Sequence, residues 1–129
     1  MMTKRFLRSA PHLPVKNLQA TFDYYMNTLG FTAHWAFGGK DGGVSRDEMR
    51  LLFAEEPQFA EGINSQAHRL PLVWFVENID EIYKEFQSRR VLISDPLQLR
   101  PYGLWEFAFI DINGYYIRVA EQGDGRRDL

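Results

Sequence analysis

Hydrophobic and polar positions follow a pattern that occurs twice along the chain. The stretch VKNLQATFDYY begins at Val15, and the stretch VENIDEIYKEF begins 61 positions later at Val76. Each opens with a valine, has an asparagine two residues on, and then spaces apolar side chains as on one face of a helix. A fixed period indicates a repeated structural unit, so we expect two copies of one module.

Each repeated stretch predicts a short helix. Asn17 and Asn78 are good N-cap residues, and Gly30 is a typical stop after the first helix. The apolar stripes that would face the core are Leu18, Phe22, Tyr25, Met26 and Leu29 in the first helix, and Ile79, Ile82, Tyr83 and Phe86 in the second.

The other apolar runs are short and bounded by turn formers, which is typical of strands. They predict strands within 10–15, 31–39, 44–56, 70–76, 91–96, 102–111 and 115–122, with turns at 40–43, 46–48 and 111–115 and a strand end at Pro96. Each half therefore reads strand–helix–strand–strand–strand, an α+β pattern. We expect a single domain with one module over about 6–55, a linker over 56–69, a second module over about 70–122 and a polar tail over 123–129.

Composition narrows the classes of function. The net charge of −2 and the lack of a long basic run argue against a nucleic-acid partner. The absence of cysteine excludes disulfides, thiolate nucleophiles and cysteine-ligated zinc. No stretch approaches the ~18 consecutive apolar residues of a membrane span, and the N-terminus lacks the apolar core of a signal peptide. These features predict a cytoplasmic protein.

Four stretches resemble the vicinal oxygen chelate superfamily, which includes glyoxalase I, extradiol dioxygenases and the fosfomycin- and bleomycin-resistance proteins. They are LPVKNLQATFDYYMNTLGF, GGVSRDEMRLLFA, LVWFVENIDEIYKEF and PYGLWEFAFIDINGYYIRVAE. The resemblance covers residues 6–122 and is strongest to the bleomycin-resistance proteins. It implies that two βαβββ modules form a rolled mixed β-sheet with a central cleft and outer helices, and that the protein is a homodimer.

The resemblance also implies where metal ligands would lie. The first position is Ala10, its equivalent in the second half is Pro71, the last is Arg118, and the remaining one falls in the apolar run 51–53. None of these side chains is a metal ligand. The histidines His12, His34 and His68 also lack ligand spacing. We therefore expect no metal, no other cofactor and no catalytic residue.

Strand alternation predicts which side chains face the cleft. If the former ligand positions face it, so do His12, Phe75, Tyr116 and Arg118. Glu106 lies in an apolar strand and needs a partner, for which Arg118 is the candidate; this pair either contacts a ligand or is purely structural. The candidate ligand-binding residues are His12, Trp35, Phe37, Phe75, Tyr102, Trp105, Glu106, Tyr116 and Arg118.

The leading hypothesis is a metal-free protein that sequesters a small aromatic molecule in this cleft, and a bleomycin-like antibiotic is one candidate. The alternative for each of these rings is core packing, and strand alternation assigns Trp74 to the core. One alternative is a divergent metal-dependent lyase, isomerase or dioxygenase of the same superfamily. A second is a non-catalytic domain that binds a partner or has a regulatory role.

Overall fold

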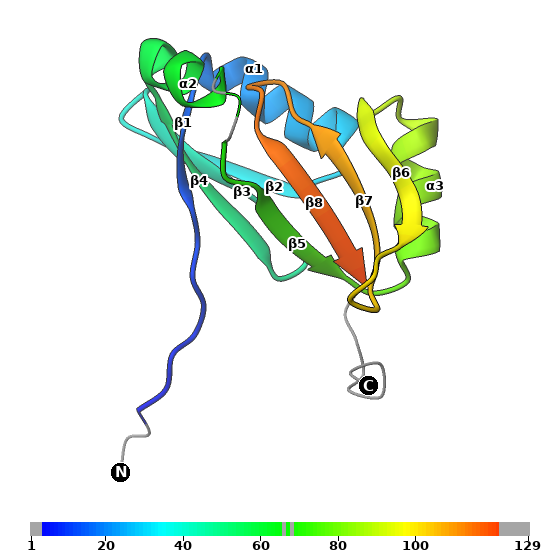
Figure 1. The fold of residues 1–129 in the computed structure, drawn as a ribbon. Coiled ribbons are helices and arrows are strands. Elements are labelled where there is room, and N and C mark those ends of the chain that lie inside the picture. Colours follow the sequence, from blue (N-terminus) through cyan, green and yellow to red (C-terminus); the bar gives the residue numbers. More distant parts are fainter. Residues whose placement is uncertain (1–3, 66, 68, 122–129) are drawn as a thin grey trace.

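The computed structural model describes residues 4–65, 67 and 69–121, and it confirms two βαβββ modules (Figure 1). The predicted tail 123–129 and His68 lie outside the described residues. The first module contains β1 (His12–Val15), α1 (Leu18–Asp23), the π-helical turn η1 (Tyr24–Thr28), β2 (Ala33–Phe37), β3 (Asp41–Arg46) and β4 (Met49–Glu55). After α2 (Pro57–Asn64), the second contains β5 (Leu72–Val76), α3 (Ile79–Ser88), β6 (Ile93–Leu99), β7 (Trp105–Ile110) and β8 (Tyr116–Glu121).

Both modules pair their strands in the same way. The sheets have the orders β1-β4-β3-β2 and β5-β8-β7-β6. In each, the first strand is parallel to the last, and the other pairs are antiparallel. His12 lies opposite Leu52 in the first sheet, and Val73, 61 positions after His12, lies opposite Arg118 in the second. Leu52 and Arg118 therefore occupy equivalent places in the two sheets.

The two modules share one hydrophobic core. Tyr25 from η1 is fully buried, and its ring lies 6.4 Å from the ring of Trp74 on β5. Phe31 lies 5.8 Å from the same indole, and Phe109 on β7 lies 5.5 Å from it. Burying a side chain of this size contributes roughly 1.5–3 kcal/mol, so contacts across the junction hold the halves together.

Polar bonds also cross the junction between the modules. The Tyr25 hydroxyl donates to Asp111 Oδ2 at 2.7 Å, and the Tyr115 hydroxyl donates to the Pro14 carbonyl at 2.6 Å. Burial raises the pKa of Asp111, although the hydrogen bond from Tyr25 and backbone N–H groups oppose that rise. Burial also raises the pKa of Tyr115 to about 12. The tyrosines therefore stay protonated and continue to donate.

The two N-cap asparagines differ in conformation. Asn17 is extended, and its Oδ1 accepts a 2.7 Å bond from the backbone N–H of Ala20. Asn78 has a left-handed backbone, with φ +56°, and makes no side-chain cap. Gly30 has φ +73° and ends the first helical segment as expected.

Three local predictions differ from the structure. The turn expected at 40–43 lies at 38–40, because Asp41, Gly42 and Gly43 already belong to β3. A side chain at Gly43 would overlap the Trp35 ring, so only glycine fits there. Pro96 does not end its strand: β6 continues through it, since it is an edge strand with irregular pairing. The linker 56–69 contains the helix α2, which begins at Pro57.

The segment before β1 leaves the body of the molecule. Residues 4–9 run away from both sheets (Figure 1), and Phe6 and Leu7 are exposed. Among the described residues, no helix is long and apolar enough to cross a membrane.

Candidate functional site

Cross-strand pairing brings several predicted site residues onto one face of the second sheet. Phe75 on β5 lies opposite Ala120 on β8, and Ala120 lies opposite Glu106 on β7. In the next row Arg118 lies between Val73 and Ala108. Directly paired residues point to the same side of a sheet. We call this side, away from the shared core, the open face of the second sheet.

Glu106 and Arg118 form the polar centre of this open face. Arg118 Nη2 donates to Glu106 Oε2 at 2.8 Å and to the Tyr102 hydroxyl at 2.9 Å. Arg100 approaches the other carboxylate oxygen, with Nε 3.5 Å from Oε1. The Glu106 side chain is only 2% exposed, whereas that of Arg118 is 31% exposed. The arginine therefore presents part of its guanidinium to solvent, while the carboxylate beneath it is covered.

The charges around Glu106 keep it ionised. Burial alone would raise the pKa of Glu106, but hydrogen bonds from Arg118 and Tyr102 and the nearby arginine charges outweigh burial. The net pKa lies below the usual value. Hydrogen bonding and attraction to Glu106 raise the pKa of Arg118 despite opposing desolvation. The pair is thus a fixed charged unit near neutral pH.

Tyr116 extends the polar cluster along the same face. Its hydroxyl donates to Asp95 Oδ2 at 2.9 Å, and Arg100 Nη2 lies 3.8 Å from that oxygen. Arg100 therefore lies between the carboxylates of Asp95 and Glu106. Burial, followed by the bond and charge of Asp95, raises the pKa of Tyr116.

Two exposed rings border the cluster, and one predicted ring does not. Phe75 is 55% exposed and Tyr102 is 53% exposed. Trp105 is also exposed, but it lies at the start of β7, opposite Leu99, and strand alternation turns it to the other face from Glu106. Trp74 also points away from the open face, into the shared core.

The remaining predicted residues lie on the first sheet. His12, Leu52, Gly43 and Trp35 form one cross-strand row. The Trp35 ring lies against Gly43, and the guanidinium of Arg50 lies 4.7 Å from its centroid.

Phe37, on the same strand as Trp35, is strongly exposed. His12 Nε2 is 3.9 Å from Asp41 Oδ1, and both side chains are exposed. Within the described chain, no hydrogen bond, ion pair or ring contact joins His12, Trp35 or Phe37 to the Glu106 cluster.

The expected metal-ligand positions can now be placed in the fold. Arg118 is held by Glu106, and the equivalent place in the first sheet is the apolar Leu52. Ala10 and Pro71 lie two residues before the equivalent His12 and Val73. Within the described part of the chain, no group of three or more His, Asp or Glu side chains is arranged to hold a metal ion.

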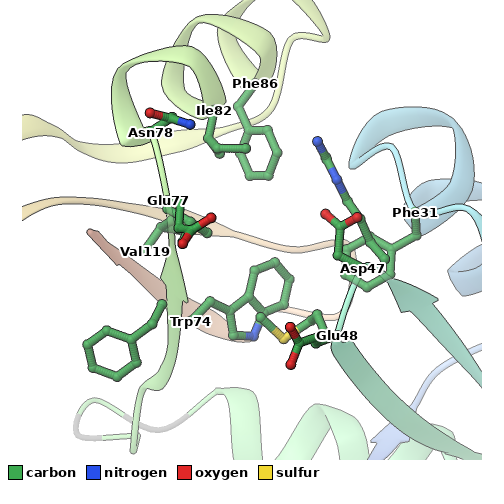
Figure 2. A pocket seen from close by; sticks show the side chains of 13 residues that line it. Phe31, Asp47, Glu48, Trp74, Glu77, Asn78, Ile82, Phe86 and Val119 are labelled. Atoms are coloured by element: carbon green, nitrogen blue, oxygen red, sulfur yellow. The ribbon is translucent and has the colours of Figure 1, made fainter. Parts of the chain in front are cut away.

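The structure also contains a cavity that the sequence did not predict. It has a volume of about 870 Å³ and lies between the β3–β4 turn and the segment that joins β5 to α3 (Figure 2). Of the predicted site residues, only Phe75 lines it. Its charged lining residues include Asp47, Glu48 and Glu77. The sequence offers no spacing pattern that links the first two to the third, because packing of the modules brings them together.

Comparisons with known proteins point to one family. The family described as Glyoxalase/Bleomycin resistance protein/Dioxygenase superfamily matches residues 7–119. A search of curated proteins finds no match.

Solved structures share the fold at low sequence identity. A bleomycin-binding protein from bleomycin-producing Streptomyces verticillus, complexed with copper(II)-bleomycin, is 22% identical with a TM-score of 0.72, covering 94% of this chain and 100% of that one. A bleomycin resistance determinant encoded on the transposon Tn5 is 18% identical with a TM-score of 0.76, covering 91% and 98%. A glyoxalase/bleomycin resistance protein/dioxygenase from Alicyclobacillus acidocaldarius is 15% identical with a TM-score of 0.76, covering 94% and 95%.

Proposed function

The chain belongs to the glyoxalase/bleomycin resistance protein/dioxygenase superfamily, and on that premise we propose that it binds and sequesters a small aromatic molecule without a metal. The observation that carries the proposal is the Glu106–Arg118 pair. Arg118 stands at the place expected for the last metal ligand and is neutralised there by a buried carboxylate. Binding would make or break no covalent bond.

The open face of the second sheet suits a planar ligand. The exposed rings of Phe75 and Tyr102 border it, and stacking on a ring contributes roughly 0.5–1.5 kcal/mol beyond the area buried. Between them, the partly exposed guanidinium of Arg118 offers N–H donors that would fix the orientation of a bound molecule. A few polar groups among apolar walls are typical of small-molecule sites.

Bleomycin-like antibiotics are the first ligands to test. Two of the compared structures are bleomycin-binding or bleomycin-resistance proteins, although their low identity to this chain supports only the fold. We expect isothermal titration of copper-loaded or metal-free bleomycin to show saturable binding, with one ligand per chain. Tyr102→Ala should weaken that binding about tenfold, because a stacking surface is lost.

A matched control exists for the ring substitution. Phe59 on α2 is 55% exposed, like the rings of the open face, but lies on another element. Phe59→Ala should leave the affinity unchanged. If neither form of bleomycin releases or absorbs heat, the bleomycin assignment is wrong. If Phe59→Ala weakens binding as much as Tyr102→Ala, the ligand does not occupy the open face.

A homodimer is also part of the proposal. It is supported by the segment 4–9, which extends from the body (Figure 1) and contains the exposed Phe6 and Leu7. Exposed apolar side chains such as these, and exposed rings such as Phe37, are stabilised when a second copy covers them.

A further inference from the structure

The cavity between the two modules is separate from the polar cluster on the open face. Its floor is apolar: Phe31, Trp74 and Phe86 are each at most 6% exposed, and Ile82 and Met49 lie beside them. Trp74 lies at the centre of this floor (Figure 2). A volume of about 870 Å³ is in the range of cavities that hold small organic ligands.

Three carboxylates line the rim of this cavity. Glu77 lies on one side, and Asp47 and Glu48 lie on the opposite side, with the Trp74 indole between them (Figure 2). All three side chains belong to exposed residues, and none forms an ion pair or hydrogen bond with another described residue. Their negative charge is therefore not compensated within the described chain.

The positive groups near the cavity are already neutralised. Arg46 lines the cavity, but its two terminal nitrogens bond the two oxygens of Glu85 at 3.0 and 2.8 Å, and one of them also bonds the Leu29 carbonyl. The positive end of α3 faces Asp80 and Glu81 in its own first turn. The uncompensated charge at the rim is therefore negative.

We propose that this cavity binds a small organic cation that carries an aromatic ring, such as an aryl-alkyl amine. The ring would lie against Trp74, Phe31 and Phe86, and the ammonium group would lie between Glu77 and the Asp47–Glu48 pair. Facing carboxylates raise the local concentration of cations, and an indole is the best ring for contact with one. This is a second binding site, and of the residues proposed for the open-face site it shares only Phe75.

Three probes with the same ring and chain but different charge test the proposal. Phenylpropylamine, phenylpropanol and phenylpropanoate are titrated into the full chain by calorimetry. We expect the amine to bind about tenfold more tightly than the alcohol, and the carboxylate more weakly than both. Higher ionic strength should reduce the advantage of the amine, because the rim carboxylates are exposed. Equal affinities for amine and alcohol would overturn the cation assignment, and no saturable binding would overturn the site.

The indole N–H signals of the three tryptophans locate the bound probe by NMR. Only the Trp74 signal, assigned with Trp74→Phe, should move on addition of phenylpropylamine. Movement confined to Trp35 or Trp105 would place the probe on another part of the molecule and contradict the proposal.

Substitution of the rim carboxylates tests their role. The triple variant Asp47→Asn, Glu48→Gln, Glu77→Gln should bind amine and alcohol equally. A control with the same change in charge, Asp23→Asn, Glu56→Gln, Glu61→Gln, alters exposed positions outside the cavity and should keep the preference. If the control variant also loses the preference for the amine, that preference comes from the net charge of the protein and not from the rim carboxylates. Tyr102→Ala should not change the affinity for the amine, because Tyr102 does not line the cavity. The same substitution should weaken binding at the open face, so the two proposals can fail separately.

Discussion

At the scale of single residues, the second sheet accommodates a buried charge by surrounding it with donors. Glu106 receives bonds from Arg118 and lies near Arg100, while Tyr102 binds the same guanidinium. A buried carboxylate without such partners would become protonated. Here the partners outweigh desolvation, and the pKa of Glu106 is lowered. Folding therefore favours the charged form.

The lowered pKa of Glu106 predicts a dependence of stability on pH. A carboxylate whose pKa is lower in the folded state contributes stability above its unfolded pKa, near the usual 4.5, and loses it as pH falls through the folded pKa. We expect Glu106→Gln to reduce the free energy of unfolding by about 2 kcal/mol at neutral pH, because two arginines lose their counter-charge. The difference from wild type should shrink below about pH 4.5.

Urea denaturation across this pH range measures the effect. Glu48→Gln, which neutralises an exposed carboxylate in the turn between β3 and β4, serves as the control and should not alter stability. A constant difference between wild type and Glu106→Gln down to about pH 3 would show that the charge of Glu106 contributes nothing.

At the scale of elements, the repeated phrase produces two helices with different starts. Asn17 caps α1 through its side chain, whereas Asn78 precedes α3 in a left-handed conformation without capping it. The same residue at the same place in the repeat therefore has two roles. Its identity predicts a helix start in both modules, but the path of the preceding strand decides the backbone conformation.

Substitution of the two asparagines should change stability in opposite directions. Asn17→Ala removes a cap and should lower the free energy of unfolding by about 1 kcal/mol. Asn78→Gly places a residue that favours positive φ at φ +56° and should raise it by up to ~1 kcal/mol. Chemical denaturation of both variants tests this. An equal loss in Asn78→Gly would mean that its side chain caps α3 in solution.

The alternation of apolar residues predicted the strands well but not all of their ends. β5, β7 and β8 lie inside the expected runs. Alternate side chains of each strand pack in the core, and this alternation is what the sequence pattern detects. β6 was predicted to end at Pro96, yet an edge strand tolerates a residue without an N–H group. Glu106 and Arg118 were proposed as partners and do bond, whereas the partners Arg100 and Tyr102 approach through the turn before β7.

At the scale of the whole molecule, the exposed segment 4–9 bears on the proposed dimer. Light scattering should give twice the chain mass of 15.1 kDa. The double variant Phe6→Asp, Leu7→Asp should shift the protein towards single chains, because it replaces the exposed apolar side chains with charges.

Phe59→Asp is the control for this experiment, since it introduces a charge at an exposed ring on α2. It should leave the mass unchanged. A wild-type mass of one chain at every concentration would contradict the dimer. A doubled mass that Phe6→Asp, Leu7→Asp does not reduce would mean that another surface joins the copies.

The sequence alone determined the two modules, their helix faces and the unsuitability of Ala10, Pro71 and Arg118 as metal ligands. Those features depend on local periodicity and on side-chain chemistry, which do not require knowledge of the packing. Tertiary structure decided the further partners of Glu106, which are Arg100 and Tyr102, the face of Trp105, and the cavity between Asp47 and Glu77. These depend on how two modules meet, because residues tens of positions apart become neighbours only when the shared core forms around Tyr25 and Trp74.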